Sequence, residues 1–194
     1  MITENMRGLI KNGATIRAMF EEGKELARKY GKENVYDFSL GNPNVETPEE
    51  IKKLICEIVS EEDSLNLHGY MSNSGYEDVR KTIANSINKK YELNIDEQSI
   101  VMTCGAAGGL NIIFKSILEE GDEVIVFAPF FGEYSNYIKN FKGKEVIAST
   151  EENTFLPDVE DLKRNITERT KAVIINSPNN PTGVIYSSKV IEDI

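Results

Sequence analysis

Apolar and polar positions along the chain follow two different periods, and the change from one to the other predicts where helices and strands lie. Apolar residues recur every three or four positions within 14–30, 51–59 and 79–91, which is typical of amphipathic helices. Further along, the pattern changes to short continuous apolar runs, which are typical of buried strands. Strands are expected at Ser99–Thr103, Glu123–Phe127, Glu145–Ser149 and Lys171–Asn176.

Helical segments alternate with the expected strands. They are expected at Ala107–Leu118, Gly132–Phe141 and Asp158–Ile166, whereas the segment from Ser64 to Ser74 is expected to be a loop. Strands that alternate with helices favour a parallel sheet with right-handed crossovers. The predicted fold class is therefore α/β, with a three-layer, mostly parallel sheet flanked by helices.

Composition excludes some classes of protein. A net charge of −10 argues against a nucleic-acid partner, because surfaces that bind nucleic acid are normally basic. No apolar run is long enough to cross a bilayer and no secretory leader is recognisable, so we expect no membrane partner and a cytoplasmic location. Cys56 and Cys104 lack metal-ligand spacing, and Cys104 is expected to be a reduced thiol in the core. The single histidine, His68, is expected in an exposed loop, and we expect no metal site.

Small residues mark the junction between the expected strand at 99–103 and the following helix. The sequence at 104–109 is Cys-Gly-Ala-Ala-Gly-Gly. Small side chains let backbone N–H groups approach an anion at the positive end of a helix, so the junction is a candidate phosphate site. The spacing matches neither the dinucleotide fingerprint nor a P-loop. Tight packing of a helix on a sheet explains the same residues equally well.

Two other strand ends carry candidate ligand-binding residues. The strand at 123–127 leads into Ala-Pro-Phe-Phe at 128–131, where an aromatic ring either stacks on a flat ligand or covers the core. The strand at 171–176 leads into Ser-Pro-Asn-Asn-Pro-Thr-Gly at 177–183, which also reads as a plain turn. Its Asn180 offers both a hydrogen-bond donor and an acceptor. Because open α/β sheets bind ligands at the carboxyl ends of their strands, the three sites together suit a small, planar, phosphorylated ring.

In their order and spacing, these motifs resemble the N-terminal half of a class I/II aminotransferase, an enzyme of fold type I that depends on pyridoxal 5'-phosphate (PLP). The resemblance runs from about Asn12 to the last residue. It implies an N-terminal arm and small-domain segment at 1–46, then an incomplete large PLP-binding domain at 47–194. The motifs that carry it are Gly41-Asn42-Pro43, Tyr70 with Gly75, Tyr76 and Arg80, Gly105-Ala106-Ala107, Gly121-Asp122-Glu123-Val124, Pro129-Phe130-Phe131 and Asn179-Asn180-Pro181-Thr182-Gly183.

The resemblance implies a role for each candidate residue. The backbone at 105–107 would hold the cofactor phosphate, Phe131 would stack on the pyridine ring, and Asn180 would hydrogen-bond the phenolic oxygen of the ring. Tyr70 would reach the phosphate in the partner's site of a homodimer; the alternative is a loop tyrosine packed on its own subunit. Gly41 would lie near the substrate carboxylate, where a residue without a side chain leaves room.

The resemblance also places three functional groups downstream of residue 183. They are the lysine that forms the Schiff base with the cofactor, an acidic partner for the pyridine nitrogen, and an arginine for the substrate carboxylate. Lys171 and Lys189 are expected to be solvated surface lysines, so no catalytic residue is assigned within the 194 residues. The implied reaction transfers an amino group between an amino acid and a 2-oxo acid, and the 194-residue chain alone is expected to be inactive.

Two alternatives stay open at this point. The same scaffold supports other PLP reactions, such as those of a C–S lyase or a decarboxylase. The second alternative is a non-enzymatic binding module that retains half of the scaffold. For the fold, the resemblance implies that the strand ending at Thr103 lacks its sheet neighbours and that the strand ending at Asn176 has a bare edge.

Overall fold

The structure is a computed structural model that describes residues 2–38, 41 and 45–194, without the side chains at positions 5, 9 and 11–17. Contacts between residues divide the chain into two compact units, Met1–Tyr70 and Met71–Ile194, and each is described by itself. The domain boundary expected between residues 46 and 47 stays a prediction.

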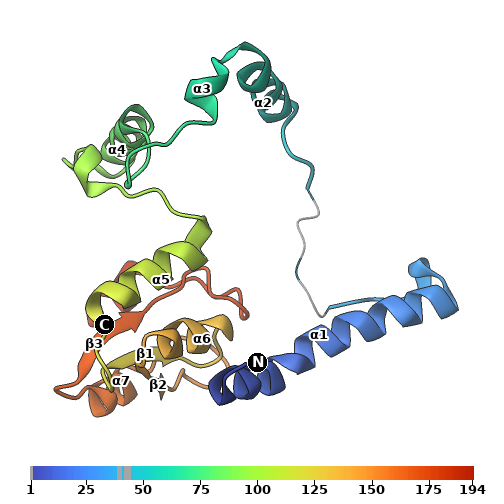
Figure 1. Cartoon of the computed structure of the whole chain (residues 1–194). Helices are drawn as coiled ribbons and strands as arrows, with labels where there is room; N and C mark the ends of the chain where they lie inside the picture. Colours follow the sequence, from blue (N-terminus) through green and yellow to red (C-terminus); the bar gives the residue numbers. More distant parts are fainter. Residues whose placement is uncertain (1, 39–40, 42–44) are drawn as a thin grey trace. The chain divides into compact units, whose positions relative to one another are not determined.

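A long helix, α1 (Glu4–Tyr30), begins the first unit (Figure 1). It starts well before the helix expected over 14–30. At its beginning, the hydroxyl of Thr3 accepts the N–H of Met6 at 3.2 Å, a capping bond that satisfies one of the free donors of the first turn. It ends at Gly31, where φ is 88°, a backbone conformation that favours glycine.

Three further helices follow among the described residues of the first unit. They are η1 (Lys32–Asn34), α2 (Glu49–Glu61) and α3 (Ser64–Leu67). The prediction of a loop over the whole of 64–74 is therefore wrong at its start. There the carboxylate of Asp63 accepts the N–H groups of the first turn of α3, which allows a short helix to form. His68 follows α3 and is exposed, as expected.

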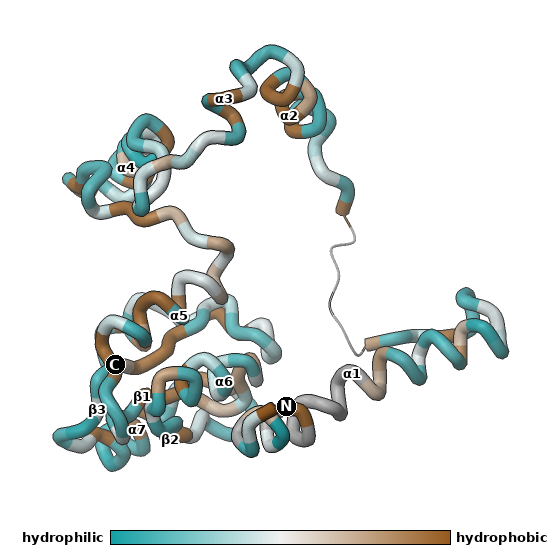
Figure 2. The backbone as a smooth tube through the Cα atoms, in the orientation of Figure 1, coloured by the Kyte–Doolittle hydropathy of each residue, from teal (hydrophilic) through white to brown (hydrophobic). Residues whose placement is uncertain are grey.

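The apolar face of α2 is uncovered within the first unit. No residue of α2 is buried in the unit as described, although the helical period predicts a core-facing stripe. Figure 2 shows hydrophobic positions on this helix. The stripe consists of side chains that are between 39% and 66% exposed, namely Ile51, Leu54, Ile55, Ile58 and Val59.

The second unit begins with α4 (Glu77–Tyr91), which packs against η2 (Glu97–Ser99). The buried side chain of Arg80 joins them: its Nε donates to the carbonyl of Gly75 at 3.3 Å and its Nη1 donates to the carbonyl of Glu97. A buried guanidinium needs such acceptors, since an unpaired charge in the interior is costly. Arg80 therefore holds η2, which precedes the segment leading toward the sheet, against α4.

The strand expected at Ser99–Thr103 is not formed in the described structure. Ser99 closes η2, and residues 100–103 belong to no sheet; the N–H of Met102 donates to the carbonyl of Ser74 at 2.9 Å. A strand exists only where a neighbour accepts its backbone hydrogen bonds, and no described strand lies beside this segment. The prediction of a strand at 99–103 is therefore wrong in the described structure, and the lack of a neighbour is what the family resemblance implies.

A parallel three-stranded sheet forms the centre of the second unit. Its strands are β1 (Glu123–Phe127), β2 (Lys144–Ala148) and β3 (Thr170–Ile174), in the order β2-β1-β3. Ile125 of the central strand lies opposite Val146 on one side and Val173 on the other. Every residue of β1 is buried, as expected for a strand covered on both faces. Within the sheet as described, β3 is an edge strand, which agrees with the expected bare edge.

One face of the sheet is covered by two helices. Val124 and Val126 of β1 point to this face and pack with Phe114 and Ile138. These two side chains come from α5 and α6, respectively, and all four are at most 2% exposed. The helices that alternate with the strands along the chain are α5 (Gly105–Ile117), α6 (Glu133–Asn140), α7 (Val159–Asn165) and α8 (Ser188–Asp193).

The opposite face carries a second buried cluster. Successive side chains of a strand alternate between faces, so Ile125 and Phe127 point away from the first cluster. They pack with Leu162 of α7 and with Ala148 of β2, and Ile194 lies against the same cluster. Helices thus flank a parallel sheet on both sides, which confirms the predicted three-layer α/β fold class.

A buried carboxylate joins the amino ends of the strands. Glu123 of β1 is 6% exposed, and its oxygens accept from Lys144 Nζ at 2.8 Å and from the Thr167 hydroxyl at 2.6 Å. The bond from Lys144, followed by that from Thr167, lowers the pKa of Glu123 below its usual value despite burial. Through these two bonds Glu123 links β1 to β2 and to the turn before β3. The lowered pKa means that the folded state favours the anion, which is the form that makes both bonds.

Glu123→Gln is expected to lower the free energy of unfolding at pH 7 by about 1.5 kcal/mol, the lower end for hydrogen bonds to a charged group, because the Lys144 side chain is exposed. Since the folded-state pKa is lowered, the carboxylate stabilises the fold above its unfolded pKa, and this contribution is lost as the pH falls through the folded pKa. Urea unfolding followed by far-UV circular dichroism from pH 7 to pH 3 measures the difference. Glu152→Gln, at an exposed position, is the control. Equal pH dependence of the three proteins would contradict the assignment.

Candidate functional site

The carboxyl edge of the sheet, where β1, β2 and β3 end, collects the candidate residues of the second unit. Phe131 follows β1, and Asn180 follows β3, its parallel neighbour. The helix α5 packs on the sheet and joins β1 through the short connection 118–122, so it runs back along the sheet and begins at the same edge (Figure 1). The topology therefore directs the start of α5 and both loops to one edge.

The start of α5 leaves backbone donors available. Cys104 is its N-cap and, among the described residues, makes no side-chain capping bond. The first N–H groups of a helix have no acceptor within the helix, so those of Ala106 and Ala107 can serve an external anion. The N–H of Gly105 donates to the carbonyl of Thr103 at 2.9 Å instead. A phosphate, which needs donors at the positive end of a helix, fits this arrangement.

The contribution of Gly105 is the shape of the backbone. Its φ is 67°, and a Cβ built there would meet no described atom within 4 Å. The need for glycine is therefore conformational and does not arise from lack of space. By contrast, a Cβ at Gly108, one turn into the helix, would make ordinary contacts with Cys104 and Thr103 at 3.5 and 3.7 Å.

Cys104 is exposed, so the prediction of a core thiol is wrong. That prediction relied on a sheet strand at 99–103, and a strand that is covered on both faces buries its neighbours. Because residues 100–103 join no sheet in the described structure, nothing covers the end of this segment.

Phe130 and Phe131 divide the two roles that the sequence left open. Phe130 packs on the core cluster and stacks on Tyr134, with ring centroids 6.4 Å apart. Phe131 is 40% exposed and meets Tyr134 edge-on, at 5.6 Å and an interplanar angle of 83°. Phe130 therefore covers the core, and part of the Phe131 ring remains accessible at the carboxyl edge.

The loop that contains Asn180 is held by side chains that accept backbone N–H groups. Asn176 Oδ1 accepts the N–H of Asn180 at 2.8 Å, and Ser177 Oγ accepts the N–H of Tyr186 at 2.8 Å. The side chain of Asn180 itself is exposed and has no hydrogen-bond partner among the described residues. The loop is thus a compact turn, and it leaves the Asn180 amide available to a ligand.

Two candidate residues lie in the first unit, and each is described within that unit. Tyr70 is fully exposed in its unit. Gly41 is exposed too, and a Cβ built there would meet no described atom within 4 Å. Asn42 and Pro43, which complete the motif of Gly41, lie outside the described residues.

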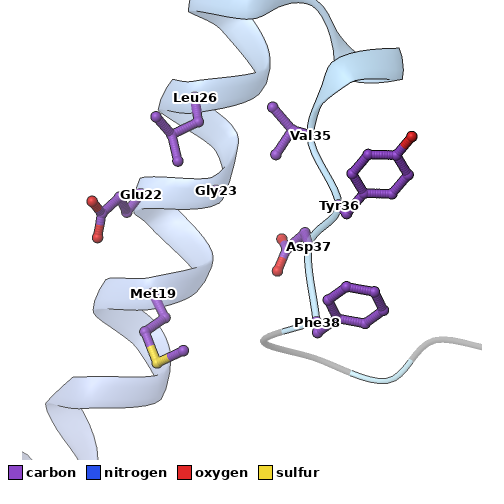
Figure 3. A pocket seen from close by; sticks show the side chains of 8 residues that line it. All are labelled: Met19, Glu22, Gly23, Leu26, Val35, Tyr36, Asp37 and Phe38. Carbon is purple, nitrogen blue, oxygen red and sulfur yellow. The ribbon is translucent and has the colours of Figure 1, made fainter.

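The described structure contains hollows that the sequence motifs did not predict, and two of them illustrate this. One, of about 350 Å³, lies within the first unit between α1 and residues 35–38, and Figure 3 shows its lining. A Cβ at Gly23 would approach Asp37 Oδ2 to 2.8 Å, so a side chain there would require the Asp37 carboxylate to move. The other, of about 740 Å³, is open and lies beside Pro129 and residues 149–153 at the carboxyl edge.

Neither a cluster of metal ligands nor a membrane-spanning helix occurs among the described residues. No group of three or more histidine, cysteine, aspartate or glutamate side chains is placed to hold a metal ion there. In the same part of the chain, no helix combines the length and the apolar character required to span a bilayer.

A parallel α/β sheet with free backbone donors at a helix start on its carboxyl edge agrees with fold type I of the PLP-dependent proteins. The model of the family "Aminotransferase class I and II" matches residues 33–194. The chain therefore belongs to the class I and II aminotransferases, a PLP-dependent family.

Known relatives agree with this membership. The chain is 32% identical to the aspartate aminotransferase of Pyrococcus horikoshii, over 97% of the chain and 46% of that protein. It is 33% identical to the aspartate/prephenate aminotransferase of Thermus thermophilus, over 96% of the chain and 49% of that protein. The chain thus spans about half the length of the curated relatives that it matches.

Solved structures share the fold. An amino transferase from Eubacterium rectale matches with a TM-score of 0.92 at 38% identity, over 99% of this chain and 48% of that one. The aspartate aminotransferase of Thermus thermophilus with maleate matches with a TM-score of 0.79 at 31% identity, over 92% of this chain and 45% of that one.

Gly105→Ala is expected to lower the free energy of unfolding by about 1 kcal/mol, because a side chain disfavours the left-handed backbone at this position. Gly108→Ala is the matched control. It is expected to stabilise the chain by about 0.5 kcal/mol, since alanine favours the helix and its Cβ finds ordinary contacts. Urea unfolding measures both, and an equal effect of the two substitutions would argue against the conformational role of Gly105.

Proposed function

We propose that the second unit supplies the N-terminal part of the PLP site of an aminotransferase, which transfers an amino group between an amino acid and a 2-oxo acid. One observation carries the proposal: the start of α5, the exposed ring of Phe131 and the unpaired amide of Asn180 lie at the same carboxyl edge. Each offers what one part of a phosphorylated pyridine ring requires, and membership of a PLP-dependent family supports the same ligand.

The cofactor phosphate would bind at the start of α5. The N–H groups of Ala106 and Ala107 would donate to its oxygens, and the helix dipole would stabilise its charge. Gly105 would shape the backbone so that both N–H groups face the same anion. Small side chains at these positions let the phosphate reach the backbone.

The ring would lie between the two loops that follow β1 and β3. Phe131 would stack on the pyridine, since its ring is accessible while that of Phe130 covers the core. The Asn180 amide would donate to the phenolic oxygen and so fix the orientation of the ring. When bound, PLP withdraws electrons from the substrate carbon that bears the amino group.

The first unit would contribute two further contacts. The fully exposed side chain of Tyr70 would reach the phosphate in the partner's site of a homodimer. Gly41 would leave room for the substrate carboxylate, because it has no side chain. In this proposal residues 1–46 are the N-terminal arm and small-domain segment, and residues 47–194 are part of the large domain.

Ala107→Asp should weaken binding of pyridoxamine 5'-phosphate about tenfold, because it places a negative charge beside the phosphate. This ligand carries the phosphate and the phenolic oxygen but no aldehyde, so it forms no adducts with surface lysines. An acidic residue in the first turn stabilises a helix, which separates loss of binding from loss of folding. Equilibrium dialysis with the 194-residue chain measures the affinity. Ala107→Asn, of the same shape but uncharged, is the control, and equal affinities of the two variants would overturn the phosphate assignment.

The 194-residue chain alone is expected to show no turnover with PLP, an amino acid and a 2-oxo acid. Lys171 lies near the amino end of β3, away from the carboxyl edge, and Lys189 pairs with Asp193 on α8. Neither is positioned to hold the cofactor covalently. Borohydride treatment in the presence of PLP, followed by peptide mapping, should give no stoichiometric adduct at a single lysine. Such an adduct together with turnover would overturn this expectation.

A further inference from the structure

Asn179 is the buried polar residue of the loop that carries Asn180. Its side chain and backbone together are 8% exposed, whereas Asn180 beside it is exposed. A buried amide requires hydrogen-bond partners, because leaving its groups unpaired costs free energy. The partners of Asn179 therefore show which part of the chain it holds.

The backbone of Asn179 closes the turn. Its N–H donates to the carbonyl of Val184 at 2.9 Å, and its carbonyl accepts the N–H of Gly183 at 2.7 Å. Both bonds reach across Pro181 to residues on the far side of the turn. They fix the two ends of the segment that presents Asn180.

The side chain of Asn179 adds further bonds in the same direction. Its Oδ1 accepts the N–H of Thr182 at 3.2 Å and the Thr182 hydroxyl at 2.9 Å. The amide also bonds the hydroxyl of Tyr186. Burial raises the pKa of Tyr186, and the bond from Asn179 opposes part of that rise, as expected when the amide donates to the phenol oxygen.

Asn180 is consequently held on both sides. Its own N–H is fixed by Asn176 Oδ1 at 2.8 Å, and Thr182 is fixed by Asn179. Its side chain is the part of this short segment left without a described partner. These bonds hold the backbone on both sides of Asn180, and so they set the direction in which its side chain leaves the loop.

We propose that Asn179 is a positioning residue, which directs the amide of Asn180 toward the ring of the bound cofactor. The inference rests on the proposed function, because it assigns the target of Asn180. Other side chains do not replace the amide at position 179. Alanine leaves the Thr182 and Tyr186 hydroxyls without this partner, and aspartate cannot donate to the Tyr186 oxygen and buries a charge.

A double-mutant cycle tests the proposal with the 194-residue chain and pyridoxamine 5'-phosphate. Asn180→Ala removes the proposed contact and should weaken binding about tenfold, the cost of one hydrogen bond of about 1.4 kcal/mol. Asn179→Ala should weaken binding by a similar factor. In the double variant, Asn179→Ala should add almost nothing, because the side chain that it positions is already gone.

Hydrogen exchange supplies a readout independent of the ligand. The amide protons of Thr182 and Val184 should exchange faster in Asn179→Ala and at the wild-type rate in Asn180→Ala. Tyr186→Phe keeps the buried ring and removes one of the bonds, so it should show the same changes to a smaller degree in a folded chain. Far-UV circular dichroism monitors folding of all variants.

The outcomes separate this inference from the proposed function. If Asn180→Ala does not change the affinity, the contact of Asn180 with the ring is wrong. If Asn180→Ala weakens binding and Asn179→Ala does not, the positioning role is overturned. It is equally overturned if Asn179→Ala weakens binding by the same factor with and without the Asn180 side chain, since the effect would then be purely structural.

Discussion

The burial of β1 on both faces is the interaction on which the second unit depends. Because every residue of β1 is buried, its side chains supply both core clusters, with Val124 and Val126 on one face and Ile125 and Phe127 on the other. The helices pack on the sheet where their apolar side chains contact these clusters. Their packing determines where α5 begins and where the loops after β1 and β3 emerge. The geometry of the candidate site therefore follows from the central strand.

Local sequence patterns predicted most of this fold. The predicted bounds of β1 agree with the structure, because a turn precedes the run of Val, Ile and Phe and a proline follows it, and these mark where the strand begins and ends. The prediction of a strand at 99–103 was wrong although its apolar pattern is just as clear. A strand forms only when a partner strand, which is distant in the sequence, lies beside it. The same cause exposes Cys104. The short helix α3 was missed because a single capping carboxylate, that of Asp63, decides it.

The candidate site was predictable to a similar extent. Motifs identified the start of α5, the Phe130–Phe131 pair and the loop of Asn180, but not how neighbouring residues divide their roles. Whether Phe130 or Phe131 faces the core depends on how the chain leaves β1, and only the packing reveals it. Likewise, the sequence alone does not distinguish the roles of the two adjacent asparagines, Asn179 and Asn180. Their different burial results from hydrogen bonds with residues beyond Pro181.

The loop around Asn180 has a property that extends beyond its own geometry. Its hydrogen bonds join residues within 176–186 and span at most nine positions along the sequence. The hydrogen bonds that shape the loop are thus encoded by a short stretch of sequence, whereas the rest of the unit supplies the burial of Asn179 and Tyr186. The loop therefore depends on the remainder of the unit for its burial and on its own residues for its hydrogen bonds.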